Sequence, residues 1–591
     1  MRKWYKFIFY GAAAVAIHPV FAQVFEQGQA QIVTEFSDPE TWITHDLWVE
    51  TNFDSDGDGR PDRMHVSVTR PAQTDTEGLK LAVIYNTSPY FAGVAPMIPG
   101  LFWDVNVELG EMPAERAHPE VKRTGTRPVI STTHIDTWVP RGFAVVHSSS
   151  PGTGLSDGAP TIGGENESLA PKAVIDWLCG RAKGYTSRTG SETVDAYWSL
   201  GKVGMIGTSF NGTLALAAAT TGVEGLEVIV PIAPNTSYYH YYRSNGLVRS
   251  PGGYAGEDID VLYDFVHSGD EAKRASNNTR IRDGILAKNM DRITGDYNDF
   301  WHSRDYLHKM DNMKAAMLMA HGFNDWNVMP EHSYRIYKKA REMGLPTHIY
   351  YHQGGHGGPP PLEMLNKWFS KYLYQVENDV EKGDKAWIVR ENETWPTSYP
   401  DYPNPNAVDV TYYLLKGGNE MGLLQTQKPA EKGVKESWID DASQWPNDLA
   451  RAEKSPYRLL YVSDVLEEDV HISGVPRVTV SVSSSKPAAN LSVMLVALPW
   501  KKDGRFYENV ITRGWADPQN YKSLRESEPL EKGKFYEVSF DLMPDDQIIE
   551  KGRRLGLMIF SSDREFTLRP KAGTELTIDL DNTWIRLPIV R

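Results

Sequence analysis

Short apolar runs alternate with helical patterns through the first two thirds of the chain. Leu79 to Tyr85 is an almost continuous apolar run, which suits a strand buried on both faces of a sheet. Further β-prone runs cover residues 64–69, 142–147, 202–206, 226–232, 315–321 and 347–351. Apolar residues recur at helical spacing within 173–178, 213–220, 330–343 and 362–374. This alternation predicts an α/β fold with a mostly parallel sheet and helices on both faces.

Two later segments depart from this alternation. Residues 235–311 are polar, aromatic and helix-prone, which predicts a helical cap inserted over the sheet. Residues 396–409 are rich in proline, tyrosine and asparagine, as linkers often are. Beyond them, short β-prone runs predict an all-β sandwich or jelly roll over residues 410–591. The α/β domain is then expected to consist of residues 23–234 and 312–395.

The amino-terminal residues predict an exported protein. A basic start is followed by an apolar run over residues 7–17, which ends at Val20-Phe21-Ala22. Such a pattern is typical of a signal peptide cleaved after Ala22, so that residues 1–22 are removed. The mature chain would then be periplasmic or secreted by a bacterium, without a membrane segment. The alternative is an uncleaved membrane anchor, for which the run is short.

Charge and cysteine content narrow the classes of function. The 591 residues include 62 Lys+Arg and 77 Asp+Glu, a net charge of −15, which argues against nucleic acid as a partner. The single cysteine, Cys179, excludes an intramolecular disulfide and a cysteine-based zinc site. The composition leaves the oligomeric state open between a monomer and a homo-oligomer.

Ser209 stands where a β-prone run passes through a tight turn into a helical stretch. The turn reads Gly207-Thr-Ser-Phe-Asn-Gly212. A nucleophilic serine needs its hydroxyl lifted out of such a turn, and flanking glycines let strand and helix approach without a Cβ clash. The spacing is G-x-S-x-x-G, whereas the usual elbow has glycine at the place of Asn211. We interpret Ser209 as the candidate nucleophile.

Two other candidates follow later strands. Asp325 comes after the run 315–321 and can orient a histidine, although it could instead form an Asx turn that caps the next helix. His356 follows the run 347–351 and is flanked by glycines, as suits a general base that needs room for substrate; His352 is its competitor. The order Ser, Asp, His, with a strand before each, is what an α/β-hydrolase requires.

An oxyanion hole would complete this site. The backbone N–H of Phe210, the residue after the nucleophile, should supply one donor. Tyr90, in the loop after the run 79–85, could supply a phenolic hydroxyl as the second donor, although a packing role is the alternative for a tyrosine.

Longer stretches carry a resemblance to a known family. They include GKVGMIGTSFNGTLALAAATTGVEGLEVIV (201–230), HGFNDWNVMPE (321–331) and GVPRVTVSVSSSKPAANLSVMLVALPW (474–500). The chain resembles the Xaa-Pro dipeptidyl-peptidase family of serine peptidases, a group that also contains cocaine esterase and α-amino-acid ester hydrolase types. The resemblance implies an α/β-hydrolase domain with a helical cap and a C-terminal, galactose-binding-like jelly roll. It also implies catalysis by Ser209, Asp325 and His356, without a required cofactor; the familiar motif has tyrosine where this chain has Phe210.

Release of dipeptides adds a requirement for substrate binding. The enzyme must recognise a free N-terminus, so a carboxylate should meet the α-ammonium two residues from the scissile bond. Glu257 and Asp258 in the cap are the candidates, with Tyr241 beside them; a solvated helix start is the alternative for the acid pair. Trp326 and Phe210 could line a flat slot for proline, or belong to the core. The expected partner is a peptide with a free N-terminus and proline in second position.

One motif stands apart from catalysis. Asp54, Asp56, Asp58 and Asp62 offer carboxylates at alternate positions, like the first half of a calcium loop. A full EF-hand loop would have glutamate at the place of His65. The alternatives are a structural calcium ion and a turn of solvated aspartates.

Three hypotheses of function follow. The first is a serine exopeptidase that releases Xaa-Pro dipeptides. The second is an esterase, or a β-lactam or α-amino-acid ester acylase, with the same triad. The third is a non-catalytic protein that binds carbohydrate or peptide through its β domain, against which the complete triad argues.

Overall fold

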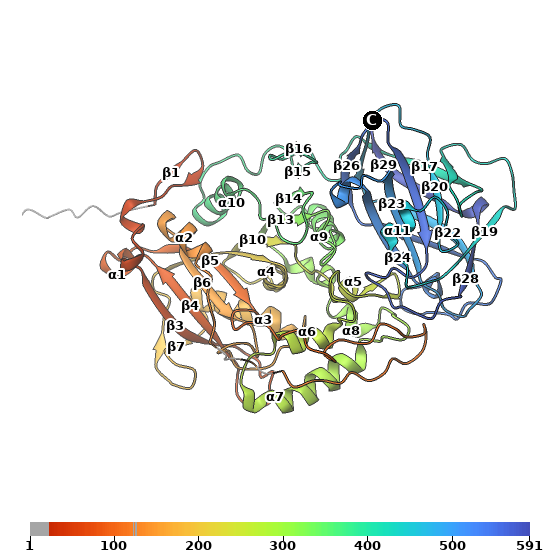
Figure 1. Ribbon diagram of the computed structural model, residues 1–591. Coiled ribbons are helices and arrows are strands. Elements are labelled where there is room, and N and C mark those ends of the chain that lie inside the picture. The colour runs from red at the N-terminus through yellow and green to blue at the C-terminus, as the bar shows by residue number, and fades with distance from the viewer. Residues whose placement is uncertain (1–22, 122, 124–126) are drawn as a thin grey trace, which may run out of the picture.

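The computed structural model describes residues 23–121, 123 and 127–591, so the predicted signal peptide lies outside the described residues. Figure 1 shows an α/β domain beside a β domain, with the cap helices along one side. Within the described ranges, no helix combines the length and the apolar character that a membrane span needs.

The α/β domain is built on a twisted sheet that is parallel in its centre. Strands β15, β14, β13, β10, β9, β5 and β6 are parallel neighbours, and antiparallel strands extend both edges. In spatial order the strands are β16 (Thr397–Tyr399), β15 (Ala386–Val389), β14 (Thr347–His352), β13 (Ala316–Gly322), β10 (Leu226–Ile232), β9 (Ser199–Thr208), β5 (Leu81–Ser88), β6 (Ala144–Ser149), β4 (Arg63–Arg70), β3 (Ile43–Glu50), β7 (Gly184–Tyr185) and β8 (Thr193–Val194).

Helices cover both faces of this sheet, as expected. The helices α3 (Glu165–Leu178), α4 (Phe210–Thr220) and α9 (Glu331–Glu342) pack on one face. The helices α2 (Thr133–Trp138) and α10 (Leu362–Tyr374) pack on the other. Every residue of β5 is buried, and its side chains alternate between the two cores. The prediction that the run 79–85 contributes a strand buried on both faces is therefore confirmed.

The cap follows β10 and lies over the carboxyl ends of the strands. It contains α5 (Tyr238–Tyr242), α6 (Ile259–Val266), α7 (Glu271–Asn277), a π-helical turn over Asn278–Ala287, and α8 (Asp299–His302). The first two thirds also contain the short helix α1 (Gln73–Thr76) and two short strand pairs. These are β1 (Phe25–Glu26) with β2 (Gln29–Ala30), and β11 (Arg243–Ser244) with β12 (Leu247–Val248).

The second domain is an almost entirely antiparallel β domain around a core of its own. Its elements are β17 (Ala407–Leu415), β18 (Gly422–Gln425), β19 (Lys435–Ile439), α11 (Pro446–Arg451), β20 (Leu459–Val462), β21 (Val470–Gly474), β22 (Arg477–Ser484), β23 (Leu491–Leu498), β24 (Val510–Ala516), β25 (Tyr536–Asp541), β26 (Asp545–Ile549), β27 (Arg554–Phe560), β28 (Glu575–Asp579) and β29 (Trp584–Val590).

The segment expected as a linker is shorter than its composition indicated. Within 396–409, Thr397–Tyr399 forms β16 and pairs with β15, while β17 already begins at Ala407. The three residues of β16 contain no proline, so their backbone N–H groups remain available to a sheet edge. Only the residues between β16 and β17 connect the two sheets.

The β domain packs directly against the cap and the strand ends. The N–H of Ser250 donates to the carbonyl of Phe566 at 2.8 Å, and the N–H of Arg569 donates to that of Val105 at 2.7 Å. An apolar cluster joins Leu247 and Met329 to Trp515, Met543 and Phe566. One wall of the catalytic side of the α/β domain is therefore supported by the β domain.

Candidate active site

Ser209 occupies the sharp turn between β9 and α4. Its φ of 61° and ψ of −128° place it in a region that residues other than glycine rarely adopt. A Cβ on Gly207 would lie 2.5 Å from the carbonyl carbon of Asn211, and one on Gly212 would lie 2.8 Å from the carbonyl oxygen of Gly207. The crossing of strand and helix therefore needs glycine at 212, which explains the departure from the usual spacing.

Asp325 lies in the loop after β13 and is completely buried. Its Oδ1 accepts the N–H groups of Asn327 and Val328 at 3.0 and 2.9 Å, and its Oδ2 accepts Nδ1 of His356 at 2.7 Å. The residue thus forms an Asx turn with one oxygen and holds a histidine with the other. It does not cap α9, whose N-cap is Pro330.

His356 is held by the glycine-rich loop after β14. A Cβ on Gly357 would lie 3.9 Å from Cγ2 of Thr208, so the loop reaches the residue that precedes the nucleophile. The competing His352 donates from Nε2 to the carbonyl of Gly357 at 2.9 Å and accepts the N–H of Gly354 at 3.0 Å. His352 therefore shapes the loop, while His356 carries the contact to Asp325.

The two groups that would react, on Ser209 and His356, are free to form hydrogen bonds with a substrate. Within the described part of the chain, neither the hydroxyl of Ser209 nor Nε2 of His356 has a hydrogen-bond partner, and the His356 side chain keeps 32% of its surface exposed. Both groups are available to a substrate and to each other, and such contacts tighten when a substrate is bound.

Electrostatics favour an ionised Asp325. Burial would raise the pKa of this carboxyl, but the hydrogen bond from His356 and the nearby N–H group of His321 outweigh burial and hold the pKa below its usual range. A negative charge at this point stabilises the imidazolium that forms when His356 takes a proton.

Tyr90 lies next to the nucleophile, two residues after the end of β5. Its ring meets that of Phe210 edge to face at 6.0 Å between centroids, and its hydroxyl has no partner among the described residues. Burial raises the pKa of Tyr90, with a smaller contribution from Glu257, so the hydroxyl keeps its proton and can donate. Phe210 is the first residue of α4, where the N–H has no intrahelical acceptor.

We expect Tyr90→Phe to lower kcat by about 100-fold, because one preorganised oxyanion donor is lost while the ring packing stays. KM should change little. Steady-state kinetics on an anilide substrate measures both, with Tyr412→Phe in the β domain as the matched control. An unchanged kcat would remove Tyr90 from the oxyanion hole.

The structure separates the roles of the two neighbouring acids in the cap. Glu257 is buried, accepts the hydroxyl of Tyr242 at 2.9 Å, and its charge acts on the pKa of both Tyr90 and Tyr241. Glu257 therefore lies close enough to Tyr90, the candidate oxyanion donor, for its charge to act on that hydroxyl.

Asp258 is committed to the protein itself, which corrects its expected role. Its Oδ2 pairs with Arg243 at 2.9 Å and Arg292 at 2.5 Å, and its Oδ1 accepts the N–H of Ile259 at 2.8 Å. With both oxygens engaged and no exposed surface, Asp258 anchors the start of α6 and is not offered to a substrate ammonium.

The remaining pocket candidates are buried to different degrees. Tyr241 donates to Oδ1 of Asn327 at 3.3 Å, and burial raises the pKa of its hydroxyl, with smaller contributions from Glu257 and Asp325. Trp326 is half-buried at the domain boundary, against Phe566 and under the guanidinium of Arg513, 5.1 Å from its ring centroid. Much of its surface therefore serves the contact with the β domain.

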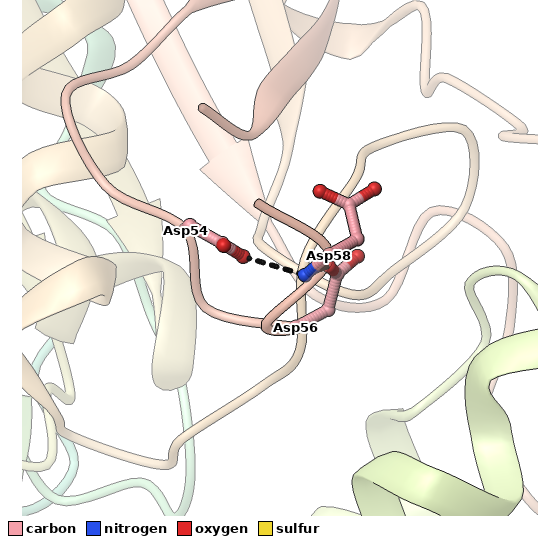
Figure 2. Close-up of side chains that lie close together, drawn as sticks. All are labelled: Asp54, Asp56 and Asp58. Carbon is pink, nitrogen blue, oxygen red and sulfur yellow. Dashed lines mark hydrogen bonds between the residues drawn. The ribbon is translucent and has the colours of Figure 1, made fainter. Parts of the chain in front are cut away.

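The acidic loop is shown in Figure 2. Carboxylate oxygens of Asp54, Asp56 and Asp58 lie within 4.8 Å of one another, and the N–H of Asp58 donates to Oδ1 of Asp54. The Lys273 ammonium bridges Asp56 and Asp58 at 2.6 and 2.7 Å. The Lys273 ammonium thus already neutralises two of the candidate calcium ligands, Asp56 and Asp58.

Asp62, the fourth expected calcium ligand, lies apart from this cluster. Its Oδ2 accepts both the N–H and the hydroxyl of Ser55. Burial raises its pKa to about 7, against the hydrogen bonds from Ser55. Of the four carboxylates that the calcium alternative requires, Asp62 is therefore turned inward to hold the loop and is not grouped with the other three.

Three residues near the site were not anticipated. Asn327 and Tyr242 hold Tyr241 and Glu257, and His321 contacts Asp325 from the end of β13 at 3.3 Å. The only signal for His321 was its position four residues before Asp325. His321 belongs to a run predicted as a buried strand, and a strand pattern does not show which loop will pack against one of its residues.

Comparisons with known proteins agree with this geometry. A family model described as X-Pro dipeptidyl-peptidase (S15 family) matches residues 56–358, and one described as the X-Pro dipeptidyl-peptidase C-terminal non-catalytic domain matches residues 372–588. A Rhodopirellula baltica protein provisionally named an Xaa-Pro dipeptidyl-peptidase is 60% identical over 573 residues, which cover 96% of this chain and 91% of that protein. An Xaa-Pro dipeptidyl-peptidase of Lacticaseibacillus rhamnosus is 32% identical over 94% of this chain and 78% of its own length.

Solved structures share the fold at low identity. An α-amino acid ester hydrolase is 16% identical with a TM-score of 0.64, covering 98% of this chain and 100% of that chain. A CocE/NonD family hydrolase from Staphylococcus aureus is also 16% identical with a TM-score of 0.64, covering 93% and 94% of the two chains. These structures support the arrangement of an α/β-hydrolase domain followed by a β domain.

Proposed function

Since the chain belongs to the X-Pro dipeptidyl-peptidase (S15) family, we propose that it is a serine exopeptidase that releases Xaa-Pro dipeptides from the N-termini of peptides. The observation that carries the proposal is the 2.7 Å hydrogen bond between His356 and the buried Asp325, beside the strained turn at Ser209. Such a set performs acyl transfer.

The reaction proceeds in two halves. The hydroxyl of Ser209 attacks the carbonyl of the second substrate residue while Nε2 of His356 takes its proton. The Tyr90 hydroxyl and the Phe210 N–H donate hydrogen bonds to the oxyanion. His356 then protonates the departing amine, and water repeats these steps to free the dipeptide. Asp325 steadies the imidazolium throughout.

Glu257 supplies the recognition of the free amino group. It is a buried carboxylate whose charge acts on Tyr90, whereas its neighbour Asp258 is already paired with two arginines. An α-ammonium that reaches Glu257 gains a charge-assisted hydrogen bond shielded from water. A substrate held there by its N-terminus presents a fixed peptide bond to Ser209, which accounts for release of units of constant length.

The rival esterase or acylase function differs in the group that is recognised. Hydrolysis of the Gly-Pro anilide, its N-acetylated form and a simple ester separates the two. The peptidase should cleave the free-amine anilide with the highest kcat/KM. Equal cleavage of the blocked anilide, or reaction with the ester alone, would contradict the proposal.

We expect Glu257→Gln to raise KM for the Gly-Pro anilide roughly 10- to 100-fold, because a charge-assisted hydrogen bond becomes a neutral one. The kcat/KM for a small ester without an amino group serves as the internal control and should stay within twofold. An equal loss on both substrates would assign Glu257 a structural role instead.

The pH dependence of KM gives a second expected result for this residue. Burial raises the pKa of Glu257 to about 8, against the hydrogen bond from Tyr242. Below that pH the carboxyl is protonated in the free enzyme, so binding an ammonium ion must expel a proton. KM for a free-amine substrate should therefore fall as pH rises towards 8, and then rise as the substrate amine itself loses its proton. Glu257→Gln should abolish the fall; its persistence would contradict the assignment.

We also propose that residues 1–22 direct export and are removed, and that catalysis requires no metal. The set of Ser209, Asp325 and His356 supports the second proposal, because such a set performs acyl transfer without a metal. In the acidic loop, Lys273 neutralises Asp56 and Asp58. Treatment with a chelator should leave both kcat/KM and the melting temperature unchanged. A fall in melting temperature that calcium alone restores would establish a structural calcium site at the acidic loop.

A further inference from the structure

His321 contacts the same carboxylate oxygen of Asp325 that accepts the hydrogen bond of His356. It lies at the end of β13 and has no exposed surface. Its Nε2 lies 2.7 Å from the carbonyl oxygen of Val328 and 3.3 Å from Oδ2 of Asp325, and its Nδ1 lies 2.6 Å from the hydroxyl of Ser333. Both of its nitrogens are therefore engaged.

The position of one proton follows from these neighbours. A carbonyl oxygen and a carboxylate oxygen can only accept hydrogen bonds, so Nε2 of His321 must carry a hydrogen in either protonation state of the ring. That hydrogen is donated to the carbonyl of Val328, and Oδ2 of Asp325 lies 3.3 Å from the same nitrogen. Ser333, from the first turn of α9, holds the other edge of the ring and keeps it in this plane.

Asp325 consequently has three hydrogen-bond donors and a fourth N–H group beside its charge. Its Oδ1 accepts the two backbone N–H groups of the Asx turn, its Oδ2 accepts Nδ1–H of His356, and Nε2 of His321 lies 3.3 Å from Oδ2. A carboxylate with all its acceptor sites filled can stay ionised and fixed in a buried position, where a partly satisfied one would be costly.

We propose that His321 is a positioning residue of the catalytic triad: the Nε2–H edge of its ring, 3.3 Å from Oδ2, holds the carboxylate of Asp325 in the orientation that receives His356. The inference rests on the proposed serine-hydrolase chemistry but not on the identity of the peptide substrate. His321 touches neither substrate nor nucleophile and acts only through Asp325.

Loss of the His321 N–H group should shift the pH dependence of activity in one direction. Without it, the negative charge on Oδ2 is less compensated, so the Asp325–His356 pair binds its first proton more tightly. The acid limb of the activity profile then moves to higher pH. Other titratable groups whose charges act on this region are His352, at the end of β14, and Tyr241, in α5. The charge of His321 also acts on His332, and all three residues are retained in the variants below.

The test uses a reagent whose reaction requires the triad but not the recognition of a peptide. A small fluorophosphonate forms a bond between phosphorus and Oγ of Ser209, fluoride leaves, and His356 takes the serine proton. Its second-order rate is measured against pH for the wild type, His321→Phe and His321→Gln. The glutamine amide can place a donor near the position of Nε2, while phenylalanine fills the space without one.

We expect His321→Phe to react roughly tenfold more slowly at its plateau, with its acid limb about one pH unit higher. His321→Gln should recover most of both effects. The matched control is His348→Phe, which replaces another buried strand histidine, on β14, that packs against Trp368 and makes no contact with Asp325. It should follow the wild-type profile.

Two results would overturn the inference: a wild-type profile in His321→Phe, or a glutamine variant no better than the phenylalanine variant. If His321→Phe does not fold, nitrogen NMR of histidine-labelled wild type decides, because a His321 ring without a proton on Nε2 would present a lone pair, not an N–H group, to Oδ2 and would refute the inference. A wild type that does not react at all would contradict the proposed function rather than this inference.

Discussion

Ser209→Ala is expected to reduce kcat on the Gly-Pro anilide by roughly ten-thousandfold to a millionfold. The Ser209 hydroxyl forms the acyl-enzyme, and the unusual backbone conformation of Ser209, with φ of 61°, distinguishes it from the neighbouring Thr208. The residual rate would come from the oxyanion hole and from substrate binding, which the substitution leaves in place. KM should therefore change by much less than kcat.

The measurement is a progress curve at high enzyme concentration, with mass spectrometry to detect any acyl-enzyme. Ser303→Ala, at an exposed serine of the cap, is the control and should keep full activity. Activity in Ser209→Ala above about one hundredth of the wild type would place the nucleophile elsewhere in the chain.

Asp325→Asn is expected to lower kcat by roughly a thousandfold to ten-thousandfold at neutral pH. The Asx turn through Oδ1 can survive, because an asparagine oxygen also accepts N–H groups. At the place of Oδ2, however, the amide group would meet hydrogens from both His356 and His321. His356 would be driven to the tautomer that carries its proton on Nε2, where it cannot accept the proton of Ser209.

Circular dichroism and thermal unfolding separate this effect from misfolding. Asp440→Asn is the matched control, because Asp440 is also buried and accepts the N–H and hydroxyl of Ser562, but lies in the β domain. It should keep activity. A folded Asp325→Asn with more than about a tenth of the wild-type kcat would mean that Asp325 does not orient the base.

The regular elements could be predicted where one physical signal dominates. The run 226–232 is β10 and the stretch 362–374 is α10, both with the expected bounds. In each case burial sets the pattern: a continuous apolar run belongs to a central strand, and helical spacing belongs to a helix with one covered face. The short strand β16 was missed because its residues lie within proline-rich turns that carry no such pattern.

The side-chain roles depended on distant partners and were harder to predict. Sequence could not separate Glu257 from Asp258, because the arginines that pair with Asp258 stand 15 and 34 residues away. Likewise, the inward turn of Asp62 depends on Ser55, and the ammonium at Asp56 comes from Lys273, 217 residues further along. Motif spacing identifies residue types with the right chemistry but not the neighbours that compete for them.

The central claim is that the chain removes dipeptides from a free N-terminus, with Ser209 attacking the second residue. The most direct measurement incubates one peptide that begins Gly-Pro with the wild-type enzyme, and identifies the products by liquid chromatography and mass spectrometry. We predict intact Gly-Pro and the shortened peptide, no cleavage of the N-acetylated form, and no products with Ser209→Ala. Release of a single amino acid, internal cleavage, or equal turnover of the acetylated peptide would contradict the account.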